Sequence, residues 1–299
     1  MDTALTEVAN PPQSCGPEEA LAAAAPRRPL TTIRARSGWR ALDLAQVWLY
    51  RDLLLTLAGR DIKLRYRQTA LGAIWVVLQP LIGAGIFSFV FGKVAKVPTD
   101  GVPYFLVSYV GLLAYTVFSG TLTKVSGCLV GNAQLISKVF FPRLVLPLSN
   151  AFSTLIDFGV ALVMAIIMSL SFGYSPGWHI LLLPVWLALI LMLSMGIGLY
   201  AAALMVSYRD VQYILPVATQ FFLYASPVAY PLNAVPAKYY ALYLYNPMAG
   251  LIEAFRWSLI GRGELPVGPL VYSAVCAVVA FVVGAFAFKN MEKKFADVI

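Results

Sequence analysis

Histidine and cysteine are scarce in this chain of 299 residues, which has one histidine, His179, and three cysteines, Cys15, Cys128 and Cys276. A single imidazole cannot build a histidine-rich metal centre, and three scattered thiols form neither a zinc site nor a disulfide framework. Charged residues make up 12% of the chain, about half of the usual share. Because 60% of the residues are hydrophobic, the composition excludes a disordered chain and argues against a soluble globular enzyme.

Sequence motifs of catalysis and nucleotide binding are also missing. There is no phosphate-binding G-x-x-x-x-G-K-S/T loop, no H-E-x-x-H zinc motif, no G-x-S-x-G elbow and no C-x-x-C pair. Gly196 and Gly198 lie inside an apolar stretch, where glycine allows close helix packing. A chain of this kind that moves cargo actively needs its energy from a partner or from an ion gradient.

Long apolar stretches dominate what is present. A membrane-spanning helix needs about 20 apolar residues. Six stretches qualify, at residues 70–92, 103–123, 145–171, 180–206, 211–230 and 267–288. The sequence therefore predicts an all-α polytopic membrane protein with six transmembrane helices. Pro216 and Pro227 predict a kink or break in the fifth span.

The distribution of cations sets the predicted orientation. With the amino terminus in the cytoplasm, 17 of the 22 Lys and Arg residues fall on the inner side. Such a bias is typical of cytoplasmic loops. Six spans also return the chain to the side on which it began. We therefore expect a multi-pass membrane protein with both termini in the cytoplasm.

Three regions are expected along the chain. Residues 1–38, rich in Pro and Ala, predict a disordered cytoplasmic tail. Residues 39–68 are basic, and residues 43–58 predict an amphipathic helix lying on the cytoplasmic membrane surface. The cations that follow share one helical stripe, which is as compatible with a simple positive-inside anchor as with a direct role in admitting substrate. Residues 69–299 form the transmembrane domain.

Two connections differ from ordinary loops. The inner loop at residues 124–144 predicts a short helix, capped by Ser126 or Asn132 and ended by Pro142. The outer segment at residues 231–264 is rich in tyrosine, and its second part predicts a short helix with Glu253 and Arg256 one turn apart. This segment is too polar to span and too apolar for a free loop, so we expect it to be re-entrant or interfacial.

Polar and aromatic residues within the spans leave alternatives open. Asp157 is the candidate for an intramembrane functional group, but a structural hydrogen bond near a helix end is the interpretation we favour. Aromatic side chains suit a sugar path because sugar C–H faces stack on rings, while core packing explains any single ring equally well. The aromatic residues on spans two and five are Tyr104, Tyr109, Tyr115, Phe118, Tyr213, Phe221, Phe222 and Tyr224.

Five blocks of the sequence carry a family resemblance. They are residues 60–80, 135–147, 208–211, 226–230 and 245–248, in order along residues 43–294. These blocks resemble polysaccharide-export permeases, the membrane subunits of type-2 ATP-binding-cassette exporters. Members of that family carry O-antigen, capsular polysaccharide or teichoic acid. The resemblance implies export of a lipid-linked glycan, most simply O-antigen, from the cytoplasm across the inner membrane.

The resemblance also implies partners. The permease is expected to pair with a second copy of itself and with two cytoplasmic ATP-binding subunits. ATP and Mg would be bound by those subunits, so no cofactor is expected in this chain, and nucleic acid is not an expected partner. The chain itself would be a transport subunit and not an enzyme.

Site residues follow from the same resemblance. The cations at the cytoplasmic mouth, placed to meet the pyrophosphate of the substrate, are Arg60, Lys63, Arg65 and Arg67. The coupling helix that docks on the ATPase contains Asn132, Gln134, Leu135 and Lys138. The periplasmic gate contains Tyr239, Tyr240, Asn246, Glu253 and Arg256. Spans one, two and five would line the sugar path with Tyr104, Tyr109, Tyr115, Phe118, Phe221 and Tyr224.

Other functions fit the sequence less well. A small-lipid or drug exporter of the same transporter class has the same spans, but the polysaccharide blocks disfavour it. A membrane glycosyltransferase would need acidic residues grouped at one membrane face, whereas Asp52, Asp61 and Asp210 are scattered among cations. A passive channel or scaffold would have no use for the coupling-type loop.

Overall fold

The computed structural model describes residues 44–67, 74–99, 101–263 and 265–298. Every regular element within these ranges is a helix, and none of the described residues is in a strand. The predicted all-α fold is therefore confirmed. The predicted tail, residues 1–38, lies outside the described residues.

Five helices are long and apolar enough to cross a bilayer. α4 (Ile74–Phe87) continues as a π-helix, η2 (Ser88–Val94), and η3 (Trp178–Leu182) leads directly into α9 (Leu183–Ser207). The remaining three are α5 (Tyr104–Ser126), α8 (Val145–Ser171) and α13 (Val267–Val298). They correspond to five of the six predicted spans and make the chain a multi-pass membrane protein.

The predicted fifth span, residues 211–230, is only partly helical. α10 (Val211–Ala225) has 15 residues and contains Pro216, so it is shorter than the roughly 20 residues that a spanning helix needs. The helix ends two residues before Pro227, because a proline ring disfavours helical backbone in the preceding residue. The predicted break is confirmed at Pro227.

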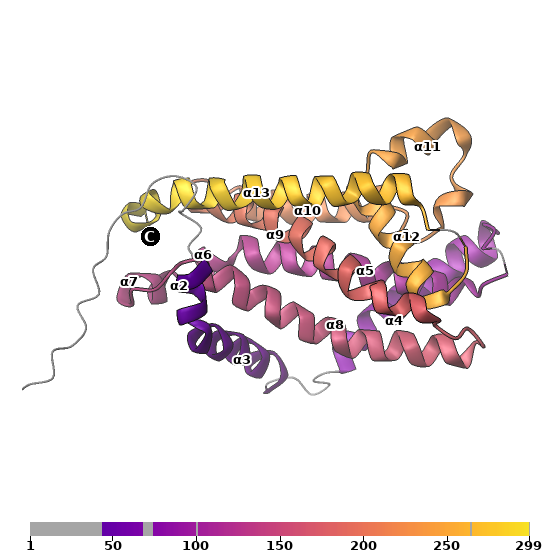
Figure 1. Ribbon diagram of the computed structural model, residues 1–299, viewed down its shortest axis with the longest axis horizontal. Coiled ribbons are helices and arrows are strands. Elements are labelled where there is room, and N and C mark those ends of the chain that lie inside the picture. The colour runs from indigo at the N-terminus through magenta and orange to yellow at the C-terminus, as the bar shows by residue number, and fades with distance from the viewer. Residues whose placement is uncertain (1–43, 68–73, 100, 264, 299) are drawn as a thin grey trace, which may run out of the picture. The chain divides into compact units, whose positions relative to one another are not determined.

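The short helices gather at the two ends of the long ones (Figure 1). α6 (Cys128–Gly131), α7 (Ala133–Lys138) and the carboxyl-terminal part of α13 lie at one end. α11 (Ala237–Leu244), preceded by η4 (Leu232–Ala234), lies at the other. α12 (Pro247–Ile260) turns back from α11 into the helix bundle and packs on α5, α9 and α13. We refer to the α7 end and the α11 end below.

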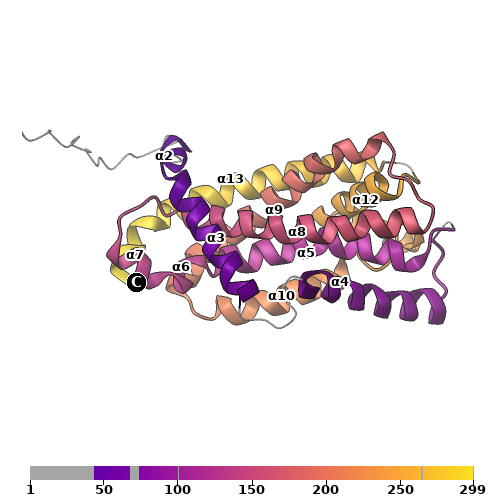
Figure 2. The ribbon, with the colours of Figure 1, turned by 90° about the horizontal axis from the view of Figure 1, so that it is seen from below.

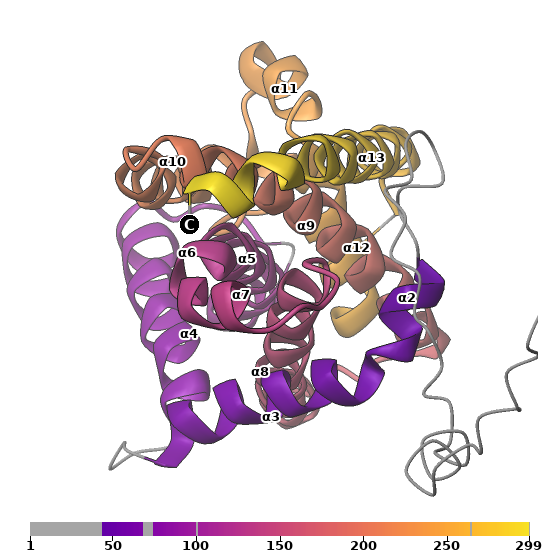
Figure 3. The same ribbon diagram turned by 90° about the vertical axis from the view of Figure 1, so that its left-hand side faces the viewer.

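The predicted interfacial helix differs from the observed one. Residues 44–67 form α2 (Leu44–Leu49) and α3 (Arg51–Arg67), which meet at Tyr50. The prediction of a helix ending near residue 58 was therefore wrong, because nothing between residues 51 and 67 breaks a helix and the basic stripe continues it. α3 runs across the axes of the long helices and packs on α8 (Figures 2 and 3).

The core is centred on α5, which the other helices surround (Figure 3). Most of α5 is buried, against contacts with α4, α8, α9 and α12. A second apolar cluster lies toward the α7 end, where Leu57 of α3 is buried with Leu129 and Leu146. Leu135 of α7 packs against the same cluster. Apolar contacts therefore join α3, α7 and the transmembrane helices.

Glycine sets the closest helix contact, between α9 and α13. A Cβ atom added to Gly196 would overlap the backbone of Ala280, and one added to Gly284 would overlap the backbone of Gly196. Only residues without a side chain allow the two backbones to approach in this way. The prediction that Gly196 serves close helix packing is confirmed.

Replacing Gly284 by leucine should separate α9 from α13. The cost should exceed the roughly 1–3 kcal/mol of ordinary overpacking, because backbone atoms must move. Thermal unfolding of the detergent-solubilised protein measures the change. Gly268→Leu is the control, since no atom lies within 4 Å of a Cβ at that position of α13. Equal melting temperatures for the two variants would contradict the assignment of this contact.

Candidate functional site

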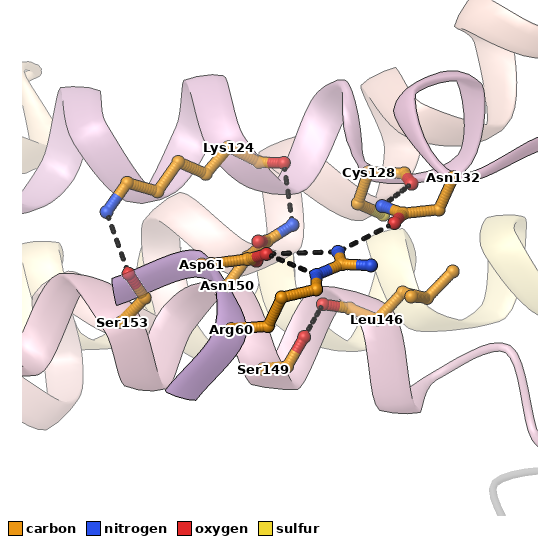
Figure 4. Close-up of polar contacts among 9 residues, drawn as sticks. All are labelled: Arg60, Asp61, Lys124, Cys128, Asn132, Leu146, Ser149, Asn150 and Ser153. Carbon is orange, nitrogen blue, oxygen red and sulfur yellow. Dashed lines mark hydrogen bonds and ion pairs between the residues drawn. The ribbon is translucent and has the colours of Figure 1, made fainter. Parts of the chain in front are cut away.

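Arg60 connects α3 with the residue that precedes α7. Its guanidinium donates to Asp61 Oδ1 through both Nε, at 3.1 Å, and Nη2, at 3.0 Å. Nη2 also donates to Asn132 Oδ1 at 3.0 Å, and Asn132 immediately precedes α7. Figure 4 shows Arg60 pointing from α3 toward Asn132. The structure thus brings together one residue from each of two predicted sites.

Asn132 does not cap α7 as the sequence predicts. It occupies the capping position, but its side chain makes no hydrogen bond to the first turn of the helix. The Nδ2 group instead donates to the carbonyl of Cys128 at 2.9 Å, while Oδ1 accepts from Arg60. Ser126 does not cap α6 or α7 either, since its hydroxyl donates back to Thr123. α7 ends at Lys138, four residues before the predicted stop at Pro142.

A cavity of about 320 Å³ lies beside the Arg60–Asn132 contact. Its walls come from α3, the end of α6 and α7, and they are formed by Arg60, Gly131, Asn132, Gln134, Leu135 and Lys138. All four predicted coupling residues are among them. Gln134 and Lys138 are exposed, whereas Leu135 is half-buried. The cavity is therefore lined by two exposed cations, Arg60 from α3 and Lys138 from α7, and by the half-buried apolar side chain of Leu135.

The other predicted cations lie along α3. Lys63 and Arg67 are exposed, and α3 also contains Arg65. Lys63 and Arg67 are not among the residues that line the cavity beside Asn132, whereas Arg60 is. Arg60, which is held by two partners, therefore differs from these two cations in its position relative to the predicted coupling residues.

The predicted aromatic path divides into two groups. On α5, Tyr109 is buried and donates to the carbonyl of Ala161 at 3.1 Å, and the hydroxyl of Tyr104 is buried as well. Tyr115 donates to the carbonyl of Thr219, and Phe118 lies 5.5 Å from Phe222 between ring centroids. Through these hydrogen bonds and ring contacts, the aromatic side chains of α5 hold α8 and α10 against it. On α10, by contrast, the exposed rings are Tyr213, Phe221 and Tyr224.

α12 is the better-anchored of the two helices in the predicted gate. Asn246 caps it, since Oδ1 accepts from the Met248 backbone amide at 2.9 Å, and Pro247 follows at the first helical position. Nδ2 of Asn246 also donates to the carbonyl of Ala225, the last residue of α10, at 3.0 Å. The gate residues Tyr239 and Tyr240 lie on α11 and are exposed.

Arg256 is a buried cation that holds the segment after α10. It pairs with Glu253 at 2.7 Å, as the spacing predicts, and is 5% exposed. Its guanidinium also donates to four backbone carbonyls, at 2.6–3.3 Å, those of Val107, Pro227, Val228 and Tyr230. Glu253 in turn accepts from the backbone amide of Leu232 at 2.7 Å. This ion pair satisfies backbone groups of the segment after α10, where no helix supplies partners, as buried polar groups require, and it also contacts the Val107 carbonyl within α5.

Gly111 makes room for this cluster. A Cβ atom at Gly111 would overlap the carbonyl oxygen of Val228 and lie 2.7 Å from the Arg256 guanidinium. The sequence analysis missed this glycine and the carbonyl ligands of Arg256. A glycine within an otherwise apolar span was the available signal, but its partners are more than 100 residues away in the chain.

The sequence of most of this helix bundle is similar to that of known proteins. Residues 52–260 match the family described as ABC-2 type transporter. The chain belongs to this family. Membership makes it a transport subunit and not an enzyme, and ABC transporters work with an ATP-binding partner.

Individual relatives match over nearly their whole length. The O-antigen export system permease protein RfbA of Myxococcus xanthus is 30% identical over 258 residues, which cover 85% of this chain and 98% of the relative. A protein of the same name from Klebsiella pneumoniae is 27% identical, covering 83% of this chain and 95% of the relative. The polysialic acid transport protein KpsM of Escherichia coli is 26% identical, covering 78% and 91%.

Replacing Arg256 by methionine should destabilise the protein by about 3–5 kcal/mol, because it leaves the Glu253 carboxylate without its cation and several buried carbonyls without a donor. Thermal unfolding in detergent measures this loss, and protease cleavage between residues 226 and 235 should increase. Arg262→Met removes an exposed cation that lies over the ring of Tyr174 and should change little. Equal stability of both variants would show that the contacts of Arg256 contribute nothing.

Proposed function

We propose that this chain is the membrane-spanning subunit of an ATP-driven exporter that moves a lipid-linked polysaccharide, O-antigen by preference, out of the cytoplasm across the inner membrane. The observation that carries the proposal is similarity along almost the full length of relatives named as O-antigen export permeases. A further relative is named for the transport of polysialic acid, another polysaccharide. These names favour a glycan over a small lipid or a drug.

The proposed topology has six crossings and both termini in the cytoplasm. α10 starts at the α7 end, and the chain after it leads to α11 at the other end (Figure 1). We propose that α10 and residues 226–235 together form the sixth crossing. Before the short helix η4, the carbonyls of Pro227, Val228 and Tyr230 accept from Arg256. Such internal partners are the condition under which irregular backbone is tolerated at membrane depth. The α7 end is then cytoplasmic.

A second copy of the chain and two ATP-binding subunits complete the proposed exporter. Large apolar side chains are exposed on α4 and η2, among them Ile82, Ile86 and Phe89, and on α10, among them Ile214 and Val217. These faces suit a helical partner or lipid. ATP and Mg would be bound by the cytoplasmic subunits, and this chain would contribute no cofactor.

Coupling to ATP hydrolysis would use the α7 end. In this proposal the exposed side of α7, with Gln134 and Lys138, meets the ATPase. A displacement of α7 would move Asn132 and, through its hydrogen bond, Arg60, which lines the same cavity. Guanidinium and ammonium groups pair well with phosphate oxygens, so Arg60, together with Lys63, Arg65 and Arg67, is proposed to meet the pyrophosphate of the substrate. Movement of the ATPase would then reposition a substrate-binding cation.

The glycan would follow the exposed rings of α10 toward α11. Phe221 and Tyr224 offer flat apolar faces for sugar rings and are exposed in the single chain. The buried rings of α5 would support this surface, with Tyr115 and Phe118 holding α10 in place. α11 and its exposed tyrosines would form the periplasmic gate, and α12 would be its fixed base.

Removal of the gene from its host should abolish the surface polysaccharide while lipid-linked glycan accumulates in the cytoplasm. This result is expected because synthesis precedes export and does not need the permease. Immunoblots of whole cells, with mass spectrometry of the extracted lipid-linked glycan, measure both pools. Loss of glycan from both pools would indicate synthesis instead of export, and unchanged pools would exclude a glycan as cargo.

A double-mutant cycle tests the contact between Arg60 and Asn132. If the two side chains act as one unit, Arg60→Ala and Asn132→Ala should each reduce export, and the double variant should be little worse than either. Contacting residues typically show coupling energies of about 0.5–3 kcal/mol. Export rate relative to the amount of assembled complex is the readout.

The matched cycle pairs Lys63→Ala with Asn132→Ala. Lys63 is exposed on the same helix but does not line the cavity beside Asn132, so its effect should add to that of Asn132. Additive effects in both cycles would exclude a functional link through Arg60.

A further inference from the structure

An ion pair inside the helix bundle is used by neither of the proposed substrate-binding regions. Lys124 Nζ, near the end of α5, lies 3.0 Å from Asp157 Oδ2 on α8. Lys124 Nζ also donates to Ser153 Oγ at 3.4 Å, and Asn150 donates to the Lys124 carbonyl at 3.0 Å (Figure 4). Asp157 itself is at the middle of α8, and its hydrogen bond is made with Lys124 close to the end of α5. Ionisable side chains within membrane helices mark functional sites by default.

A cavity of about 300 Å³ opens beside this ion pair, between α4, α5 and α8. Small residues create the space, because Gly120 and Ala161 form part of its wall. A Cβ atom at Gly120 would have Thr154 Cγ2 as its nearest neighbour, at 3.8 Å. The volume lies at the lower limit of about 300–1,000 Å³ that is typical of small-molecule sites.

The cavity wall combines hydrogen-bonding groups with an aromatic ring. Gln79, Thr116, Ser119 and Thr154 line it together with the ion pair. Neither the Gln79 amide nor the Ser119 hydroxyl has a hydrogen-bond partner among the residues that the structure describes. Trp75 stands at the rim on α4 and is 54% exposed. Donors, acceptors and an aromatic face are therefore available to one occupant.

The ion pair limits the charge of that occupant. Among the described residues that line the cavity, Lys124 and Asp157 are the charged ones, and they carry opposite charges 3.0 Å apart. A pyrophosphate would be repelled by the Asp157 carboxylate and would have to compete with it for Lys124. An uncharged polyol meets no such conflict, because its hydroxyls can donate to the carboxylate and accept from the ammonium. Its apolar C–H face can stack on the indole ring of Trp75.

We infer that this cavity is a subsite for one uncharged sugar ring of the glycan in transit. The inference rests on the proposed function and adds a contact outside the exposed aromatic rings of α10. Asp157 and Lys124 bind the ring hydroxyls, Gln79 and Ser119 add hydrogen bonds, and Trp75 covers one face. The subsite keeps the glycan bound while the exporter returns to the conformation that precedes the next transport step.

Filling the cavity tests the inference. Gly120→Leu places a side chain into the space, and Gly159→Leu adds the same bulk to α8 at a position with no atom within 4 Å of Cβ. Export should fall about tenfold for Gly120→Leu, the factor expected when one or two hydrogen bonds are lost. Assembly with the ATPase and basal ATP hydrolysis should match those of Gly159→Leu. Equal export by both variants, with equal assembly, would overturn the subsite.

Cross-linking identifies the occupant directly and does not depend on how a filled cavity folds. A benzophenone side chain in place of Gln79 is activated by light in cells that are making the glycan. We expect an adduct that reacts with antibody to the glycan and disappears in a strain that cannot synthesise it. An adduct with phospholipid alone, found by mass spectrometry, would overturn the subsite and make the cavity a lipid headgroup site.

A second benzophenone, in place of Phe221 on α10, separates failure of the subsite from failure of the proposed function. Glycan adducts at Phe221 but not at Gln79 would overturn the subsite and leave glycan export standing. Absence of glycan adducts at both positions, with surface glycan unchanged after gene removal, would overturn both. Adducts at both positions support both.

Discussion

The buried guanidinium of Arg256 is the interaction on which the α11 end of the structure depends. One side chain binds the carbonyls of Val107 on α5 and of Pro227, Val228 and Tyr230 after α10, and it pairs with Glu253 on its own helix. Irregular backbone within a membrane protein needs such partners, because no water is there to supply them. This cation fixes the continuation of α10 together with Asn246 and Ser108, which donate to the carbonyls of Ala225 and Ala229. The ion pair thus explains how a helix of 15 residues can be followed by ordered, non-helical chain.

The two ends of the helix bundle differ in how their polar contacts are made. At the α11 end they are buried and mostly involve backbone carbonyls, which have no rotamers to change. At the α7 end Arg60 is 45% exposed and is held by the side chains of Asp61 and Asn132. Exposed side-chain contacts of this kind contribute little stability, and weakly held regions are those that open first. The α7 end is therefore the physically suitable place for a moving contact, whereas α12 is suited to remain fixed.

Hydropathy predicted much of the fold, because five of the spans are defined by composition and length alone. The break at Pro227 and the pairing of Glu253 with Arg256 were also predictable, since both follow from local backbone or helix geometry. The role of Asn132 was not, because its partner Arg60 lies 72 residues away and competes with the helix end for the same oxygen. Asp157 likewise pairs with Lys124 across 33 residues. The family came from five short blocks read together, whereas the cavity beside Asp157 depends on the spacing of three helices that no single segment encodes.

The continuity of α3 has a mechanical consequence. A helix of 17 residues is about 25 Å long and resists bending. α3 lies across α8 and is bonded near its middle to the residue that precedes α7. A displacement of α7 therefore acts on a rigid helix, α3, which packs on α8, the helix that carries Asp157. If α7 moves with the ATPase as proposed, its displacement would act on α3 through the contact between Arg60 and Asn132 and would shift α8 at the wall of the cavity beside Asp157.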